Sequence, residues 1–281
     1  MLKRKGKVKS MAFKIGFAAE RSAENQNEIK CISESDVPAV RKSVVEVKFP
    51  GHSMALAYYN DMFDLKRGDL VYVDGKLEGI PGRVVDVNYN FKIKVSDYKR
   101  VIFVVDTDVR GQFFMAGSHF VTFDRDAIPN KKVVTWFKAP AKEEEVFVSG
   151  SDDTEFLLDD LSGMKIGSEI AKRGRDYYLE NKVIYISIDG DKGYAIVEGG
   201  EVYEVEFEYR DGRIRGLVCS CFCSYNCKHE FAAMLQLSET LQLISENYKE
   251  EYERTAYFAA INKGVLFAFS IEGKDKGSFT L

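Results

Sequence analysis

The sequence predicts two folded parts: an all-β N-terminal domain, built as a small barrel or sandwich, and an α+β C-terminal domain. Three observations support this fold class. The chain has 281 residues, about twice the usual length of a single domain. Short runs with apolar residues at alternate positions begin at Val44, which is typical of strands. A strongly acidic stretch over residues 142–164 then separates these runs from a second group of strand and helix patterns.

The first 43 residues are predicted to be a flexible basic N-terminal arm, because the first ten residues contain five Lys and Arg and no acid. Residues 44–141 are predicted to form the β-rich, barrel-like domain. Turn residues separate its expected strands at a spacing typical of an antiparallel barrel or sandwich. The expected strands span residues 44–49, 54–59, 69–73, 82–87, 91–95, 100–105, 119–123 and 132–137.

Residues 142–164 are expected to be an acidic linker, since eight Asp and Glu there face one Lys, and such a segment repels a phosphate backbone. The C-terminal domain is expected over residues 165–281. Its first helix is expected to begin with Ser168 as N-cap, a second helix at His229, and a third over residues 239–262. Its strands are expected at residues 183–189, 193–199, 202–209 and 213–219, followed by a terminal hairpin of residues 265–272 and 277–281.

The overall composition excludes several classes of protein. A net charge of -4 and a pI of about 5.6 exclude a generally basic nucleic-acid coat, but they leave room for a local basic face. No apolar run is long enough to span a membrane, and the basic start does not lead into the apolar segment of a secretion signal. Five cysteines, a small and odd number, favour a reducing compartment, so we expect a cytoplasmic protein.

Four of the five cysteines occur within nine residues, and a histidine follows them closely. Cys219 and Cys221 are expected on the same face of a strand, and Cys227 and His229 form a second close pair after a loop. Three thiolates and one imidazole suit tetrahedral zinc and leave no open position, which favours a structural metal. Cys223 is an additional thiol that could replace Cys221 as a ligand. Free thiols, a disulfide and an iron–sulfur cluster remain as alternatives.

This pattern of a CxC pair, a variable gap, a CxH pair and a following helix resembles the SWIM zinc finger. The likeness covers roughly residues 165–240 and includes the run Arg173-Gly174-Arg175-Asp176-Tyr177-Tyr178 before the cysteines. The resemblance implies a zinc-binding adaptor that binds DNA or RNA through the SWIM module, with a protein partner such as a helicase-like ATPase. A zinc-stabilised protein–protein interaction module of the same fold is the alternative.

Three basic residues near the cluster are the candidates for contacts to nucleic acid. Arg173 and Arg175 are expected on one exposed face of the first helix, and Lys228 precedes His229. The other interpretation of the two arginines is an ordinary solvated helix face. The chain contains no GxxxxGK[ST], HExxH or GxSxG motif, so we predict that it is not an enzyme. An active site of unfamiliar type in the N-terminal domain is the remaining alternative.

Overall fold

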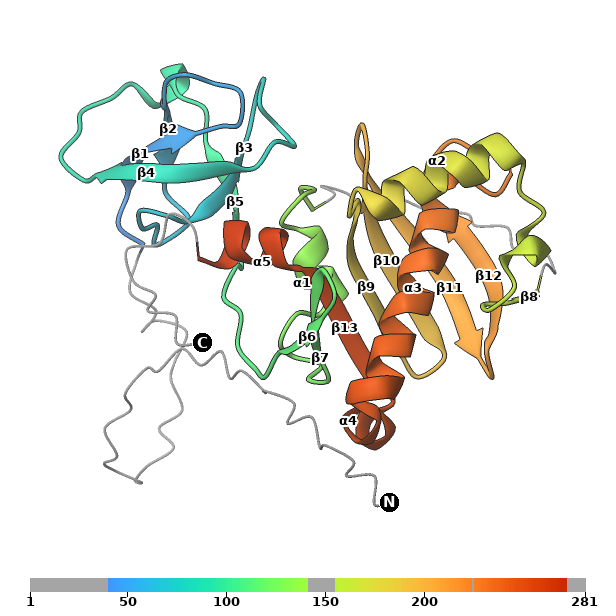
Figure 1. The fold of residues 1–281 in the computed structure, drawn as a ribbon. Helices are drawn as coiled ribbons and strands as arrows, with labels where there is room; N and C mark the ends of the chain where they lie inside the picture. The colour runs from blue at the N-terminus through green and yellow to red at the C-terminus, as the bar shows by residue number, and fades with distance from the viewer. Residues whose placement is uncertain (1–39, 141–154, 224, 272–281) are drawn as a thin grey trace, which may run out of the picture.

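The computed structural model describes residues 40–140, 155–223 and 225–271. Most of the predicted N-terminal arm, the first part of the acidic linker and the second strand of the terminal hairpin therefore lie outside the described residues. Within them, two antiparallel sheets of five and eight strands account for most of the fold, and most of the helices follow in the C-terminal part (Figure 1). This arrangement agrees with a β-rich N-terminal part and an α+β C-terminal part.

The five-stranded sheet is a small barrel with the strand order β2-β1-β4-β3-β5. A parallel bridge between Tyr59 and Arg100 joins β2 to the residue before β5 and closes the sheet. Alternate residues such as Val45, Val47 and Val71 point inward and are fully buried, as the two-residue period of a strand requires. The strands are β1 (Ser43–Lys48), β2 (Leu56–Asn60), β3 (Leu70–Val73), β4 (Gly82–Asn88) and β5 (Val101–Val105).

The eight-stranded sheet has the order β6-β7-β13-β9-β10-β11-β12-β8. Its strands are β6 (Phe114–Ala116), β7 (His119–Thr122), β8 (Phe156–Leu157), β9 (Val183–Asp189), β10 (Lys192–Glu198), β11 (Val202–Arg210), β12 (Arg213–Cys219) and β13 (Tyr257–Asn262). Strand β7 pairs with β13, and β6 pairs with β7, so neither joins the barrel. The predicted domain of residues 44–141 is therefore divided between the two sheets, because strand pairing over long sequence distances leaves no local signal.

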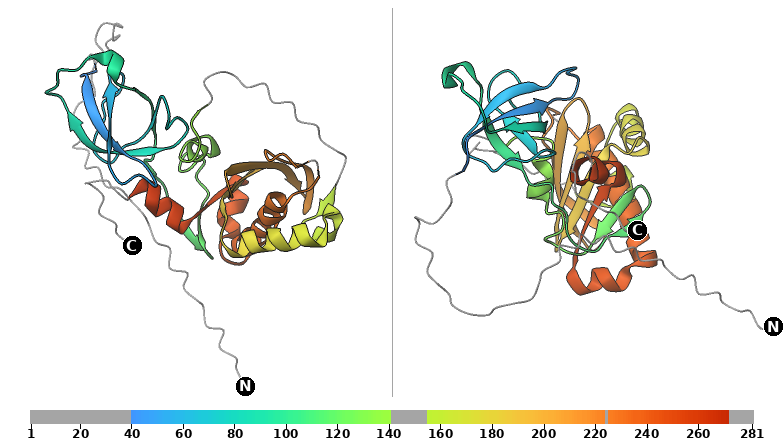
Figure 2. Two further views of the ribbon diagram at one scale, coloured as in Figure 1. Left: turned by 90° about the horizontal axis from the view of Figure 1, so that it is seen from above. Right: turned by 90° about the vertical axis from the view of Figure 1, so that its left-hand side faces the viewer.

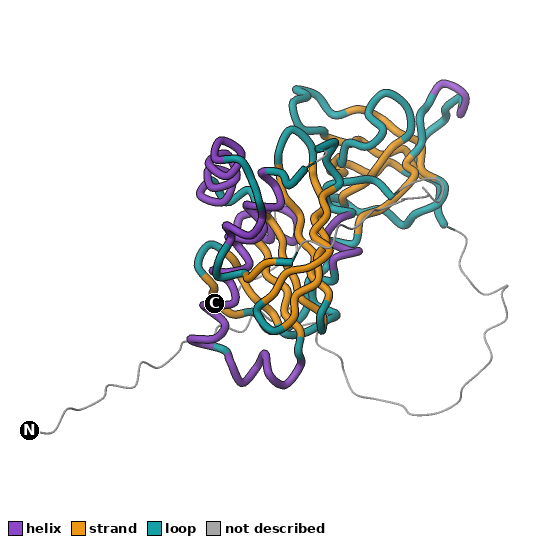
Figure 3. Tube along the Cα trace, turned by 90° about the vertical axis from the view of Figure 1, so that its right-hand side faces the viewer, coloured by secondary structure: helices purple, strands orange, loops and turns teal. Residues whose placement is uncertain are grey.

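The two faces of the eight-stranded sheet have different partners. Helices α2 (Ser168–Leu179), α3 (Lys228–Asn247) and α4 (Lys249–Thr255) lie on the side away from the barrel (Figures 2 and 3). On the other side, Tyr185 of β9 belongs to an apolar cluster. This cluster also includes Tyr72 of the barrel and Trp136, which follows residue 134 in the chain. The Tyr72 hydroxyl donates a hydrogen bond of 3.0 Å to the carbonyl of Thr135. The barrel and the sheet are thus joined by a shared core.

Two segments predicted as strands are helices instead. The predicted strand 132–137 overlaps α1 (Asn130–Val134), which begins after Pro129, a residue whose fixed φ suits a helix start. The predicted strand 265–272 overlaps α5 (Lys263–Ser270). Its N-cap is Asn262, whose side-chain oxygen accepts hydrogen bonds from the backbone N–H groups of Gly264 and Val265. Helix α5 thus has a side-chain cap that outweighs its apolar composition, whereas α1 has no side-chain cap and begins only after the proline.

Other predicted boundaries also shift. Residues 91–95 are not a strand but part of the connection to η2, a single 3-10 turn (Val95–Asp97). The predicted helix 239–262 is instead the end of α3, the short α4 and the buried strand β13. Helix α2 has Gly167 at its N-cap position, one residue before the predicted Ser168.

The end of the predicted acidic linker is part of the fold. Within residues 155–164, β8 pairs with β12 and a 3-10 helix, η3 (Leu161–Met164), follows it. Phe156 and Met164 are buried, and the Glu155 carboxylate accepts hydrogen bonds from Arg213 and Arg215 at 2.9 and 2.7 Å. Glu155 therefore belongs to the edge of the sheet, while Asp160 accepts hydrogen bonds from Ser162 at the start of η3. In the part of the chain that the structure describes, no helix is both long and apolar enough to cross a membrane.

Candidate metal centre

The candidate metal centre lies where the edge of the sheet meets the start of α3. Cys219 is the last residue of β12, Cys221 follows two residues later, and Cys227 is the N-cap of α3. The Cys227 sulfur accepts a hydrogen bond from the Glu230 N–H at 3.4 Å, while the Glu230 carboxylate accepts one from the Cys227 N–H at 2.7 Å. This reciprocal capping box fixes the first turn of α3 and with it His229.

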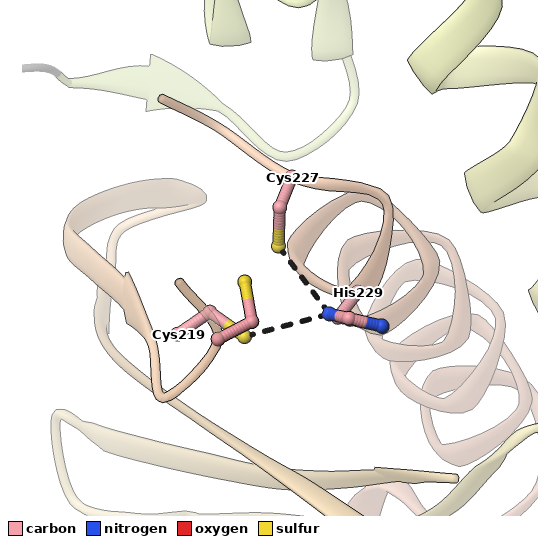
Figure 4. Close-up of side chains that lie close together, drawn as sticks. Cys219, Cys227 and His229 are labelled. Atoms are coloured by element: carbon pink, nitrogen blue, oxygen red, sulfur yellow. Dashed lines mark hydrogen bonds between the residues drawn. The ribbon is translucent and has the colours of Figure 1, made fainter. Parts of the chain in front are cut away.

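The ligand atoms of Cys219, Cys221, Cys227 and His229 all lie within 4.8 Å of one another. Figure 4 shows the sulfurs of Cys219 and Cys227 on the Nδ1 side of the His229 ring, each 3.7 Å from that nitrogen. Zinc–sulfur and zinc–nitrogen bonds of about 2.3 and 2.0 Å give tetrahedral edges of about 3.5–3.8 Å. The two sulfur–nitrogen distances therefore match these edges, and the four donor atoms, all within 4.8 Å of one another, lie close enough to hold a metal ion.

Burial distinguishes the members of this cluster from the remaining thiol nearby. Cys227 and His229 are 2% and 4% exposed, and Cys219 and Cys221 are half-buried. Cys223 is exposed and does not belong to the cluster. The fourth donor is accordingly Cys221, which preserves the CxC spacing.

The surroundings favour the neutral forms of Cys221, Cys227 and His229. Burial is the main cause that raises the pKa of the Cys221 thiol to about 12, with the neighbouring Cys227 adding to it. A hydrogen bond with Cys219, followed by burial and the Glu230 carboxylate, raises the pKa of Cys227 well above its usual range. Burial, with Lys228 and Arg173 nearby, lowers the pKa of His229 to about 4. A divalent cation would supply the positive charge that thiolates need in this position.

Two tyrosines hold the His229 ring in place. The ring of Tyr203, on β11, stacks on it at 4.0 Å, and the ring of Tyr177, on α2, meets it edge-on at 5.5 Å. The His229 Nδ1 atom faces the sulfurs of Cys219 and Cys227. The Nε2 atom is buried on the opposite edge of the ring and has no hydrogen-bond partner among the described residues. The ring can therefore offer only one nitrogen to a metal in this cluster.

A glycine allows α2 to pack against the metal-bearing end of α3. A Cβ at Gly174 would lie 2.9 Å from the carbonyl oxygen of Lys228 and 2.9 Å from the Phe231 Cβ. A side chain at this position would push the helices apart. The close approach brings Tyr177 within reach of the cluster.

The three predicted nucleic-acid contacts have different positions. Residues two apart on a helix are separated by about 200° around its axis, so Arg173 and Arg175 lie on opposite flanks of the buried Gly174 rather than on one face. Arg173 is on the flank near His229, whose pKa it affects. The Lys228 ammonium donates a 2.7 Å hydrogen bond to the Tyr177 hydroxyl and lies 4.3 Å from the centre of its ring. Lys228 is therefore already bound within the protein.

The sequence interpretation missed the residues that support the cluster. Cys227 and Glu230 have the spacing of a capping box, a signal that was available but is normally read with Ser or Thr at the first position. No local signal marks Tyr203, because it reaches His229 across the fold. Comparisons with protein-family models, curated proteins and solved structures give no match to this chain.

Proposed function

We propose that the Cys–His cluster holds one structural zinc ion and that the protein is a non-enzymatic adaptor. The donor set supports this choice: three sulfurs and one imidazole nitrogen suit zinc, and four protein ligands leave no position for a substrate. When bound, zinc would connect the end of β12 to the start of α3. Free thiols of this kind persist in a reducing compartment, so a cytoplasmic location is part of the proposal.

Elemental analysis of protein purified without added metal tests the zinc assignment. We expect about one zinc per chain and neither iron nor acid-labile sulfide. Iron in stoichiometric amount with little zinc would contradict it. Loss of zinc from Cys223→Ser but not from Cys221→Ser would show that the wrong fourth ligand had been chosen.

The partner we propose is DNA or RNA, bound beside the metal centre, as the resemblance to the SWIM finger implies. The observation that carries this proposal is the position of Arg173, which is exposed and close to His229. Within the described ranges Arg173 forms no hydrogen bond or ion pair, so its guanidinium is available to a phosphate. A helicase-like ATPase is the kind of protein that such an adaptor would accompany.

The two arginines of α2 provide a matched pair for the test. Arg173→Ala should weaken binding of labelled oligonucleotides to the zinc-loaded protein several-fold and similarly for different sequences, because phosphate contacts carry no base information. Arg175→Ala removes the same charge from the opposite flank and should have little effect. Fluorescence anisotropy at low and moderate salt measures both. Equal losses, or no association even at low salt, would contradict a site at the metal centre.

A protein partner is the second candidate, because two aromatic side chains project from the metal-bearing loop. Phe222 and Tyr225 are 106% and 87% exposed, the largest values among the exposed large apolar side chains of the described residues. Exposed aromatic residues are enriched at protein interfaces. Phe222→Ser with Tyr225→Ser should leave oligonucleotide affinity unchanged if the rings serve a protein. A loss equal to that of Arg173→Ala would instead place the rings against bases.

A further inference from the structure

Charge is distributed unevenly between the two parts of the molecule. Residues 40–105, which form the barrel, contain eleven Lys and Arg and eight Asp and Glu, a net charge of +3. Residues 155–271, which include the metal centre, contain thirteen Lys and Arg and twenty Asp and Glu, a net charge of -7. A polyanion is therefore attracted to the barrel more than to the rest of the described chain.

The excess positive charge gathers around the start of β1 and the connection from β4 to β5. We call this surface the basic end of the barrel. Its exposed members are Arg41, Lys42, Lys92, Lys94, Lys99 and Arg100. Three carboxylates lie among them: Asp97 is 3.7 Å from Lys94, Asp61 is 2.8 Å from Arg100, and Asp74 accepts a hydrogen bond from the Arg100 backbone N–H. In the described ranges Lys42 and Lys92 have no ion pair, so positive charge remains in excess.

Aromatic side chains alternate with these cations. The Arg41 guanidinium lies 4.1 Å from the centre of the Tyr89 ring, and Arg100 lies 5.3 Å from that of Tyr59. Phe91 meets Tyr59 edge-on at 6.3 Å. These contacts bring the start of β1, the strand β2 and the β4–β5 connection, which carries η2 and follows β4 in Figure 1, to one surface. Tyr89 and Phe91 remain half-exposed there.

We propose that the basic end of the barrel binds the phosphate backbone of a single-stranded nucleic acid. Cations that follow one connection can track successive phosphates, and half-exposed rings between them can stack on bases, a combination typical of single-strand binding surfaces. An acidic peptide would use the cations alone. This surface goes beyond the proposed function because it shares no residue with the metal centre, and each site can fail without the other.

Lys92 and Lys94 are the residues to change, because both side chains are exposed and neither supports the barrel. Binding of a labelled oligo(dT) of about 12 nucleotides to the full zinc-loaded chain is measured by anisotropy. Lys92→Ala with Lys94→Ala should lower affinity roughly tenfold at about 0.1 M salt and should reduce the slope of log K against log salt by about 1.4, or 0.7 per lost phosphate contact. Asp97→Asn removes a competing carboxylate and should raise affinity.

The control is Lys192→Ala with Lys249→Ala, which removes two exposed lysines from the other part of the molecule. It should change affinity less than twofold, roughly the effect of net charge alone. An equal loss in this control, or no loss in the barrel variant, would overturn the proposal. Poly-glutamate that competes as well as oligo(dT) per charge would overturn it in favour of an acidic polypeptide. Arg173→Ala reports on the metal-centre site separately, so the two proposals are told apart.

Discussion

The barrel and the eight-stranded sheet are both antiparallel, but they differ in how their edge strands are paired. The barrel closes through the bridge between Tyr59 and Arg100 and fills its interior with valines, so its strand edges are covered by its own strands. The sheet stays open at β12, where β8 pairs only with Arg213 and Ile214. The cluster begins at the far end of that strand, at Cys219. Cys219 still pairs with Val205 of β11, and the other three members of the cluster follow after the strand has ended.

The same comparison separates the two surfaces by charge. The barrel carries +3, and the part that includes the metal centre carries -7. Salt screens exposed charges over about 10 Å at 0.1 M, so each surface acts on its own neighbourhood. On the two proposals above, the barrel would attract a polyanion while the other part presents the loop that contains the Cys–His cluster.

The largest effect is expected from removal of the metal. His229→Ala or Cys227→Ser should destabilise the region around α2, α3 and the end of β12 by on the order of 5 kcal/mol, because structural zinc contributes about 10–16 kcal/mol of binding free energy in small fingers. The barrel, which holds no member of the cluster, should keep its protection. Hydrogen exchange of the two parts measures the difference. Equal loss of protection in both would show that they fold as one unit.

A second effect concerns His119 at the other end of the sheet. Its Nε2 atom lies 2.8 Å from the Val183 carbonyl, and burial lowers its pKa to about 4. The unfolded chain takes up a proton near pH 6.5, whereas the folded chain does so only near pH 4. The contribution of neutral His119 to the free energy of unfolding is therefore complete above pH 6.5. It falls by about 3 kcal/mol as the pH is lowered from 6.5 to 4.

His119→Gln should show a smaller loss of stability than the native protein between pH 7 and 4, measured by urea unfolding of both. Glutamine can still donate to the Val183 carbonyl but does not titrate. The difference between the two proteins is the relevant quantity, because acid also releases metal from thiolates in each. Parallel pH curves would contradict the assignment.

Two glycines give a matched pair, one in each part. A Cβ at Gly82 would lie 2.5 Å from the Val47 side chain in the barrel, and one at Gly174 would lie 2.9 Å from the Lys228 carbonyl. Alanine at either position should cost about 2 kcal/mol through overpacking. Only Gly174→Ala should also weaken zinc retention against a chelator, since it displaces α2 from α3. Equal zinc retention in the two variants would contradict the prediction that only Gly174 affects the metal centre.

The smallest effect concerns a single hydrogen bond between the barrel and the rest of the described chain. Tyr72→Phe removes the hydrogen bond from the barrel to Thr135 and should cost about 1 kcal/mol. Tyr185→Phe is the control, because it removes a similar 2.9 Å bond to the Ile128 carbonyl without involving the barrel. Faster exchange in the barrel for Tyr72→Phe alone is the expected result.

The ligand set could be predicted because its information is local. Cys219 and Cys221 are close in sequence, as are Cys227 and His229, so spacing locates the cluster, but only the structure separates Cys221 from the exposed Cys223. Strand β1 could be predicted from its two-residue apolar period and β9 from a short, almost continuous apolar run, both of which are short-range patterns. The position of Arg175 on the flank opposite Arg173 could also have been predicted, because the helical period of 3.6 residues fixes it.

The features of the fold and of the site that could not be predicted depend on contacts between residues distant in sequence. Membership of β6 and β7 in the second sheet is decided by pairing with β13, more than a hundred residues later. The segments that form α1 and α5 are short apolar runs whose period is ambiguous, and only α5 has a side-chain cap at its start. Tyr203 stacks on His229 only after β11 and α3 have packed.

The position of β13 has a consequence for synthesis on the ribosome. It lies inside the sheet, between β7 and β9, but it follows Thr122 of β7 by more than 130 residues. At a translation rate of about 5–20 residues per second, the pairing edge of β7 stays open for on the order of 10 s. The strands β9–β12 can pair with one another as they emerge. The hairpin β6–β7 cannot join them, so a nascent chain exposes an apolar edge that a chaperone would recognise.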